Sequence, residues 1–171
     1  LSVAYLNVDR GLEAAREIER LSYNVASEEE IVAALWQAAE LYREKSDYSS
    51  AIRAYRQYAH TYKRPYAQNM EAMARLAEIY AKIAEDEKRS FWLREMVKAD
   101  TKATKSAKTE RTQYLAAGAS FDLAEQRRKE FMNIRLAHPL PKSLQAKKAA
   151  MQDAIKLYGQ ASVYGHAEYV T

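Results

Sequence analysis

Two segments of the chain repeat one pattern of apolar and aromatic side chains, and this repeat constrains the fold more than any other sequence feature. The first segment runs from Leu35 to Tyr42, and the second, from Met73 to Tyr80, restates it further along the chain. In each segment the apolar positions follow the 3.6-residue period of an α-helix with one buried face. Because one such unit cannot bury its face alone, the repeat predicts stacked helices.

Composition favours helix elsewhere in the chain as well. The 171 residues include only 4 glycines and 3 prolines, and good helix formers occupy most of the remaining positions. Valine, isoleucine and threonine are sparse, so we predict no strand. Apolar residues make up 48% of the chain and charged residues 29%, which permits a sizeable core and argues against long disorder. The expected fold class is therefore all-α.

Capping residues divide the first half into helices. Ser27 and Glu30 have the spacing of a capping box, in which the two side chains bond to each other's backbone N–H groups. Asp47 is a predicted N-cap, and Pro65 suits the first turn of a helix. We predict helices from Asn7 to about Tyr23, from Ser27 to the turn at 46–48, from there to Pro65, from Pro65 to the turn at 85–86, and from that turn to about Asp100.

The second half predicts two longer helices. One runs from about Lys105 to Ala137 and includes Gly118, which costs about 1 kcal/mol relative to alanine. The two prolines within 138–141 end it, and the last helix ends between 159 and 165. The residues expected to face inward are Ala117, Phe121, Ala124, Phe131 and Ile134 on the first helix and Leu144, Met151, Ile155, Tyr158 and Ser162 on the second.

Several function classes lack the residues that they need. The chain has no cysteine, which excludes disulfides, thiolate catalysis and cysteine metal sites. His60, His138 and His166 lie on different predicted elements without metal-ligand spacing, and the scattered glycines form no phosphate-binding loop. The acidic clusters are explained by helix caps and exposed faces. We therefore expect a protein that is not an enzyme and holds no cofactor and no metal.

The repeat resembles the tetratricopeptide repeat. Residues 32–65 have the length of its helix-turn-helix unit, with Ala39 as the small residue where paired helices touch, Tyr42 after it and Tyr55 in the second helix. Leu76, Ala77 and Tyr80 restate the first half. The likeness is good over 32–65, fair over 66–101 and poor beyond, and Leu35 stands where the family has tryptophan. The sequence of residues 40–62 is most similar to that of bacterial cell-envelope members of the family.

This resemblance implies a right-handed superhelix of antiparallel helix pairs, an α-solenoid. Its expected parts are the last helix of a preceding repeat at 1–26, two repeat-like pairs at 27–65 and 66–102, and a long degenerate pair at 103–171. It further implies a protein-interaction scaffold of the bacterial periplasm or envelope. The chain begins without methionine, so we expect a piece of a longer protein whose exposed repeat ends could self-associate. No stretch of about 18 apolar residues is present to span a membrane.

In the family, the first helix of each pair lines a concave groove that binds a peptide or protein segment. Carried onto this chain, the groove residues are Trp36, Gln37, Glu40, Arg43, Glu44, Arg75, Glu78 and Lys82. Trp36 would anchor a ligand there or, as we favour, pack between adjacent repeats. Tyr55, Tyr58, Tyr62 and Tyr66 would stack on nucleobases or, as we favour, belong to the core with their hydroxyls at its rim.

Charge suggests an alternative partner. Residues 1–87 carry 11 basic and 15 acidic side chains, and residues 88–171 carry 16 basic and 8 acidic side chains. Within the basic half, Lys98, Lys102, Lys105 and Lys108 recur at the spacing of one helical face, and a second basic cluster follows at 127–129. A basic ridge of this kind binds nucleic acid or an anionic surface; a solvated face or a dock for an acidic protein is the interpretation that we favour.

Overall fold

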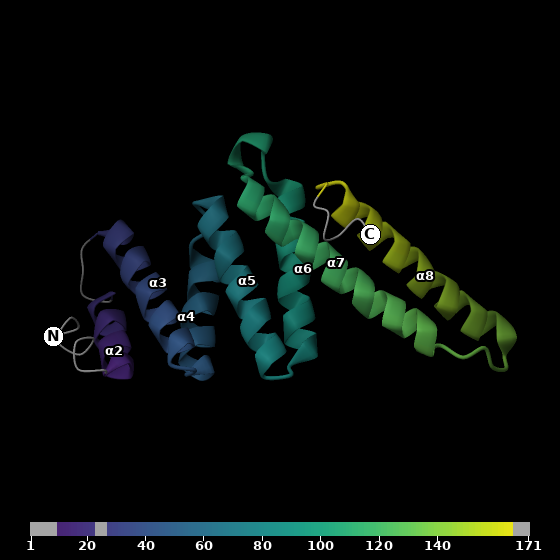
Figure 1. Cartoon of the computed structure of the whole chain (residues 1–171), viewed down its shortest axis with the longest axis horizontal. Coiled ribbons are helices and arrows are strands. Elements are labelled where there is room, and N and C mark those ends of the chain that lie inside the picture. The colour runs from purple at the N-terminus through teal and green to yellow at the C-terminus, as the bar shows by residue number, and fades with distance from the viewer. Residues whose placement is uncertain (1–9, 23–26, 166–171) are drawn as a thin grey trace. The chain divides into compact units, whose positions relative to one another are not determined.

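The computed structural model describes residues 10–22 and 27–165, and over these residues the fold is all-helical, as predicted, with no strand (Figure 1). Two compact units divide the chain, Leu1–Arg89 and Ser90–Thr171. The predicted helix limits at Asn7 and Tyr23 lie outside the described residues, as does His166. In chain order the elements are α2 (Gly11–Ser22), α3 (Glu28–Glu44), α4 (Tyr48–Thr61), α5 (Tyr66–Lys82), α6 (Asp86–Lys102), the 3₁₀ turn η1 (Lys105–Ala107), α7 (Glu110–Asn133) and α8 (Leu140–Ser162).

In the first unit, neighbouring helices along the chain pack against one another: α2 on α3, α3 on α4, and α4 on α5. The helical period places the predicted apolar positions on the buried faces. Leu35, Ala39, Tyr42, Tyr55 and Leu76 are all buried. The Asn69 amide of α5 reaches across to α4 and donates to the backbone carbonyls of Ala59 (3.0 Å) and Tyr62 (2.8 Å). This buried amide therefore supplies hydrogen-bond donors to carbonyl groups at the C-terminal end of α4.

The turns that end α3 and α5 have the same backbone geometry. Ser46 and Ala84 adopt positive φ angles of 60° and 56°. In the first turn, the N–H of Asp47 donates to the carbonyl of Tyr42 and that of Ser46 to Arg43. In the second, the N–H of Glu85 donates to Tyr80 and that of Ala84 to Ala81. Both turns are thus Schellman motifs, which satisfy the last carbonyls of a helix, and they occupy equivalent positions of the two repeated segments.

Two predicted caps of the first unit have different outcomes. The Asp47 carboxylate accepts from the Ser50 N–H at 3.2 Å, which confirms the N-cap of α4. The predicted capping box at Ser27 is wrong, because the Ser27 side chain makes no capping bond. Its backbone carbonyl accepts the Ile31 N–H instead, and the three glutamates in the first turn supply the negative charge that favours a helix N-terminus.

The long helix of the second half begins later and ends earlier than predicted. It runs from Glu110 to Asn133 rather than from Lys105 to Ala137, and Gly118 lies within it without a break. Thr109 caps it: the Thr109 hydroxyl accepts the Thr112 N–H, and the Thr112 hydroxyl accepts the Thr109 N–H. This reciprocal pair stops the helix from extending towards η1.

The buried positions of α8 are small residues, and one aromatic pair, Phe121 of α7 and Tyr158 of α8, joins the two helices with ring centroids 5.7 Å apart. The buried residues of α8 are Ala150, Ala154 and Ala161. The prediction that Leu144, Met151 and Ile155 face inward is wrong, because all three are exposed. Small residues let two helix backbones approach closely. The buried residues of α7 are mostly small as well: Thr112, Ala116, Ala117, Ala119, Ser120, Leu123 and Ala124.

The boundary between the two compact units lies between Arg89 and Ser90, within α6. The predicted division of the chain into repeats at residues 65 and 102 stays a prediction. Within residues 10–22 and 27–165, none of the helices combines the length and apolar character that crossing a bilayer requires.

Candidate functional site

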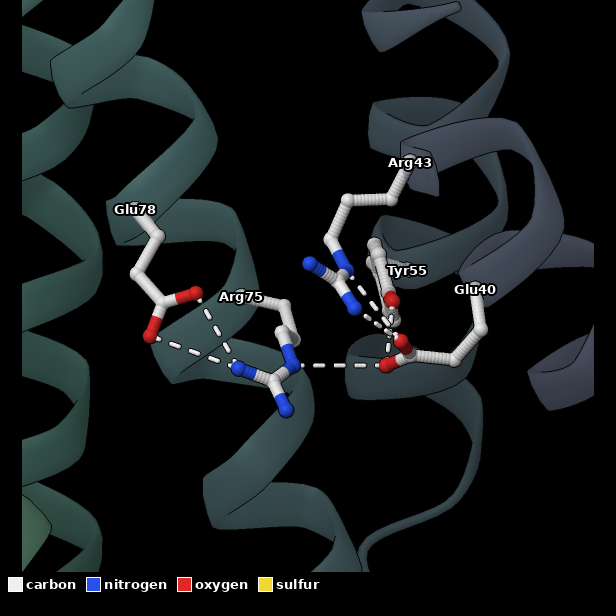
Figure 2. A network of polar contacts seen from close by, with 5 residues as sticks. All are labelled: Glu40, Arg43, Tyr55, Arg75 and Glu78. Carbon is white, nitrogen blue, oxygen red and sulfur yellow. Dashed lines mark hydrogen bonds and ion pairs between the residues drawn. The ribbon is translucent and has the colours of Figure 1, made fainter. Parts of the chain in front are cut away.

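A half-buried carboxylate, Glu40 on α3, joins three helices of the first unit (Figure 2). It accepts a hydrogen bond from the Tyr55 hydroxyl of α4 at 2.6 Å. The Arg43 guanidinium, one turn along α3, donates to it from Nε at 3.1 Å. Arg75 of α5 donates from Nε at 3.3 Å and from Nη1 to Glu78 at 3.1 Å. The alternating charges thus form a continuous network across α3 and α5.

The charges of this network shift the pKa values of its members. Burial by itself raises the pKa of Glu40, but the hydrogen bonds from Tyr55 and Arg43, with the charges of Arg43 and Arg75, bring it below the usual 4.5. Burial and the bond to Glu40 raise the pKa of the Tyr55 hydroxyl. The bond to Glu40 raises the pKa of Arg43. Glu40 is therefore a carboxylate and Tyr55 a neutral donor at neutral pH.

The predicted groove residues fall into two groups in the structure. Glu40, Arg43, Arg75 and Glu78 are brought together in this network. Gln37, Glu44 and Lys82 belong to the same two helices and are exposed; the Lys82 ammonium lies 5.9 Å from the centre of the Tyr48 ring. The two groups together are called the α3–α5 face below.

Trp36, the remaining groove residue, is half-buried and packs on two tyrosines of α4. Its ring lies edge-on to Tyr55 and Tyr58, at centroid distances of 5.6 and 5.2 Å. Tyr55 and Tyr58 are buried, and the Tyr58 hydroxyl donates to Gln68 at 2.9 Å. The core interpretation of these two tyrosines is confirmed. The ring contacts of Trp36 lie within the predicted pair 27–65, so its packing between adjacent repeats stays a prediction.

The outer edge of Trp36 faces a cavity of about 510 Å³. Residues of α3, the end of α4 and the start of α5 line it: Glu28, Glu29, Val32, Ala33, Trp36, Tyr58, Tyr62, Arg64, Pro65 and Gln68. Three aromatic side chains, Trp36, Tyr58 and Tyr62, are among its lining residues, and the Tyr62 ring lies 5.6 Å from that of Tyr58 at an angle of 56°. The charged lining residues are Glu28, Glu29 and Arg64. The cavity therefore offers an apolar recess beside the α3–α5 face.

Sequence reasoning missed a second carboxylate network at the start of the unit. Glu19 of α2 is buried, with 6% of its surface exposed. It accepts from the Tyr42 hydroxyl at 2.9 Å and from Arg53 Nη2 at 3.0 Å, and burial together with this bond raises the pKa of Tyr42 to about 12. The sequence did contain a signal for this site: Glu19 follows Ala15 by four residues and therefore lies on the apolar face of its helix.

The predicted basic ridge is not formed on one helical face. The helix α6 ends at Lys102, Lys105 belongs to η1, and Lys108 lies in the segment before α7. Lys108 pairs with the buried Asp100 at 2.7 Å, and Lys98 pairs with Glu95 at 3.1 Å. The prediction of a shared face is wrong because α6 ends at Lys102, so its helical period does not continue to Lys105 and Lys108.

Comparison with known proteins gives no relative for this chain. No protein-family model, curated protein or solved structure matches it.

Proposed function

We propose that this chain is a non-catalytic, tetratricopeptide-like interaction module that binds an extended protein segment along the α3–α5 face. The observation that carries the proposal is the pair of equivalent Schellman turns at Ser46 and Ala84, each following the same apolar pattern. A recurring helix-turn unit is the basis of solenoid binding surfaces. The Glu40–Arg75 bond adds support, since it links the first helices of the two repeated units.

The chemistry of the α3–α5 face suits a polypeptide. Carboxylate and guanidinium groups offer charge-assisted hydrogen bonds to the main chain and side chains of a bound segment. Because Arg43, Arg75 and Glu40 already hold one another, their ordering costs little on binding. The cavity beside Trp36 would accept one apolar side chain of the same segment.

A selection from a random peptide library tests this proposal. Peptides enriched on the unmodified chain would be measured against a variant in which three exposed side chains of the face are replaced: Gln37→Ala, Glu44→Ala and Lys82→Ala. We expect the variant to bind about tenfold more weakly, as for loss of one or two good interface contacts.

A matched variant controls for general surface effects. It replaces Glu13 of α2 and Gln152 and Lys156 of α8 by alanine, which are exposed residues of the same three types outside the face. The proposal requires unchanged affinity in this control. Failure of any peptide to enrich, or equal weakening in both variants, would refute it.

A further inference from the structure

The turn between α7 and α8 (Figure 1) and its flanking helix ends carry several exposed large apolar residues. Met132 is 64% exposed, Leu136 53%, Leu140 48% and Leu144 52%. The first lies near the end of α7, the second in the connecting segment, and the other two in the first turns of α8. Large apolar side chains grouped on a surface mark an interaction site. We call residues 127–148 the hairpin tip.

Basic side chains accompany these apolar ones. The hairpin tip contains seven Lys and Arg residues and one acidic residue, Glu130. Arg135, Lys142 and Lys148 are exposed, and none of them forms an ion pair with another described residue. No Asp or Glu occurs from 131 to 152. Arg127 and Arg128 form ion pairs with Glu130, Asp153 and Glu125. The tip therefore combines exposed apolar residues with uncompensated positive charge at Arg135, Lys142 and Lys148.

The connecting segment is held in place from within. Ser143 Oγ accepts the Ala137 N–H at 3.1 Å and donates to the Ala137 carbonyl at 2.8 Å. Lys147 donates to the Ile134 carbonyl at 2.9 Å, and its ammonium lies 4.7 Å from the Phe131 ring centre. These contacts define the conformation of the segment that carries Leu136, so little ordering is needed when a partner binds.

We propose that the hairpin tip docks on an anionic lipid surface, with Leu136, Leu140 and Leu144 entering the interface and the basic side chains contacting lipid headgroups. Apolar residues beside Lys and Arg are the composition of interfacial anchors, and basic clusters are attracted to acidic leaflets. The positive charge of the hairpin tip opposes its pairing with the tip of a second copy of the chain. A partner helix would require the apolar residues on one face, whereas here they are spread over α7, the connecting segment and α8.

Vesicle sedimentation tests this proposal with the whole chain. Binding would be compared between phosphatidylcholine vesicles and vesicles that contain about 30% phosphatidylserine at about 0.1 M salt, where Debye screening is moderate. We expect binding at least about tenfold tighter to the anionic vesicles, decreasing as salt rises. Two variants probe the two components. They are Leu136→Ser/Leu140→Ser/Leu144→Ser and Arg135→Gln/Lys142→Gln/Lys148→Gln.

Each variant has a control that replaces the same number of exposed apolar or basic residues elsewhere. The controls are Leu21→Ser/Ile83→Ser/Val163→Ser and Arg56→Gln/Lys63→Gln/Lys88→Gln. Both tip variants should weaken binding by about tenfold or more, and the controls by less than about twofold. Circular dichroism would verify that all four retain their helix content, as expected for exposed substitutions.

Three results would overturn the proposal: equal binding to neutral vesicles, equal weakening in tip variants and controls, or no binding to either vesicle. Duplex DNA or an acidic peptide provides a further comparison. Binding of either one that depends on the basic residues but not on the three leucines, with no preference for anionic vesicles, would also contradict it. A second measurement is the fluorescence of Leu140→Trp, which should shift to the blue on anionic vesicles alone.

Discussion

At the scale of single residues, Glu40 contributes most to the candidate face. It accepts hydrogen bonds from side chains of α3, α4 and α5, so one carboxylate fixes the positions of three neighbours. A hydrogen bond to a charged group stabilises a fold more than one between neutral groups. The hydroxyl of Tyr55, which donates to this carboxylate, should therefore matter more than that of Tyr58, which donates to an amide oxygen.

Replacing each tyrosine by phenylalanine tests this difference. We expect Tyr55→Phe to lower the free energy of unfolding by about 2 kcal/mol and Tyr58→Phe by about 1 kcal/mol. Urea denaturation followed by circular dichroism measures both values. A loss from Tyr55→Phe no larger than that from Tyr58→Phe would contradict the role assigned to Glu40.

The lowered pKa of Glu40 also predicts a dependence on pH. A carboxyl group with a lower pKa in the folded state stabilises the fold above the unfolded pKa, near 4.5, and loses this contribution as the pH falls through the folded value. Wild type should therefore exceed Glu40→Gln in free energy of unfolding at pH 7, and the gap should narrow as the pH falls below about 4.5. A gap that stays constant from pH 7 to pH 3 would be inconsistent with this shift.

At the scale of elements, the repeated Schellman turns define the unit. Ser46 and Ala84 adopt a left-handed conformation that favours glycine. We expect Ala84→Gly to raise the free energy of unfolding by up to about 1 kcal/mol, because the turn no longer strains a Cβ atom. Ala33→Gly, an exposed site within α3, should lower it by about as much. Thermal melting distinguishes the two, and destabilisation by Ala84→Gly would contradict the turn geometry.

The packing of α7 on α8 gives a second prediction at this scale. Ala154 is buried between these helices, while its neighbour Ile155 is 62% exposed. We expect Ala154→Leu to cost about 1–3 kcal/mol through overpacking, and Ile155→Ala to change the free energy of unfolding by less than about 0.5 kcal/mol. A larger loss of unfolding free energy from Ile155→Ala than from Ala154→Leu in urea denaturation would contradict this packing and would place Ile155 inward.

These elements also show what sequence can predict. The helices from α3 to α5 followed from local signals: the Asp47 cap, Pro65 and the apolar period that leads to Tyr80. The inward face of α8 followed only in part. Tyr158 was predicted to face inward and contacts Phe121 of α7, but apolar character ranks Leu144 above Ala154, whereas close approach of two helices selects the small residue. The Glu40 network was predicted only as a set of residues on one face, since the contact between Glu40 and Arg75 depends on how α3 and α5 pack.

At the scale of the whole molecule, two units carry different surfaces. The first, Leu1–Arg89, holds the repeated turns and the α3–α5 face. The second, Ser90–Thr171, contains the hairpin tip with its exposed leucines and basic side chains. This division follows the charge asymmetry of the sequence, in which acidic residues outnumber basic ones up to residue 87 and the reverse holds beyond. A polypeptide and an anionic lipid surface would therefore bind to separate units.

Hydrogen exchange of the chain with and without a selected peptide tests the central claim, binding at the α3–α5 face, most directly. Protection on binding should appear in α3 and α5, over 28–44 and 66–82, and leave α7 and α8 unchanged. Protection confined to α7 and α8, or no change anywhere on saturation with a peptide that binds, would contradict the claim.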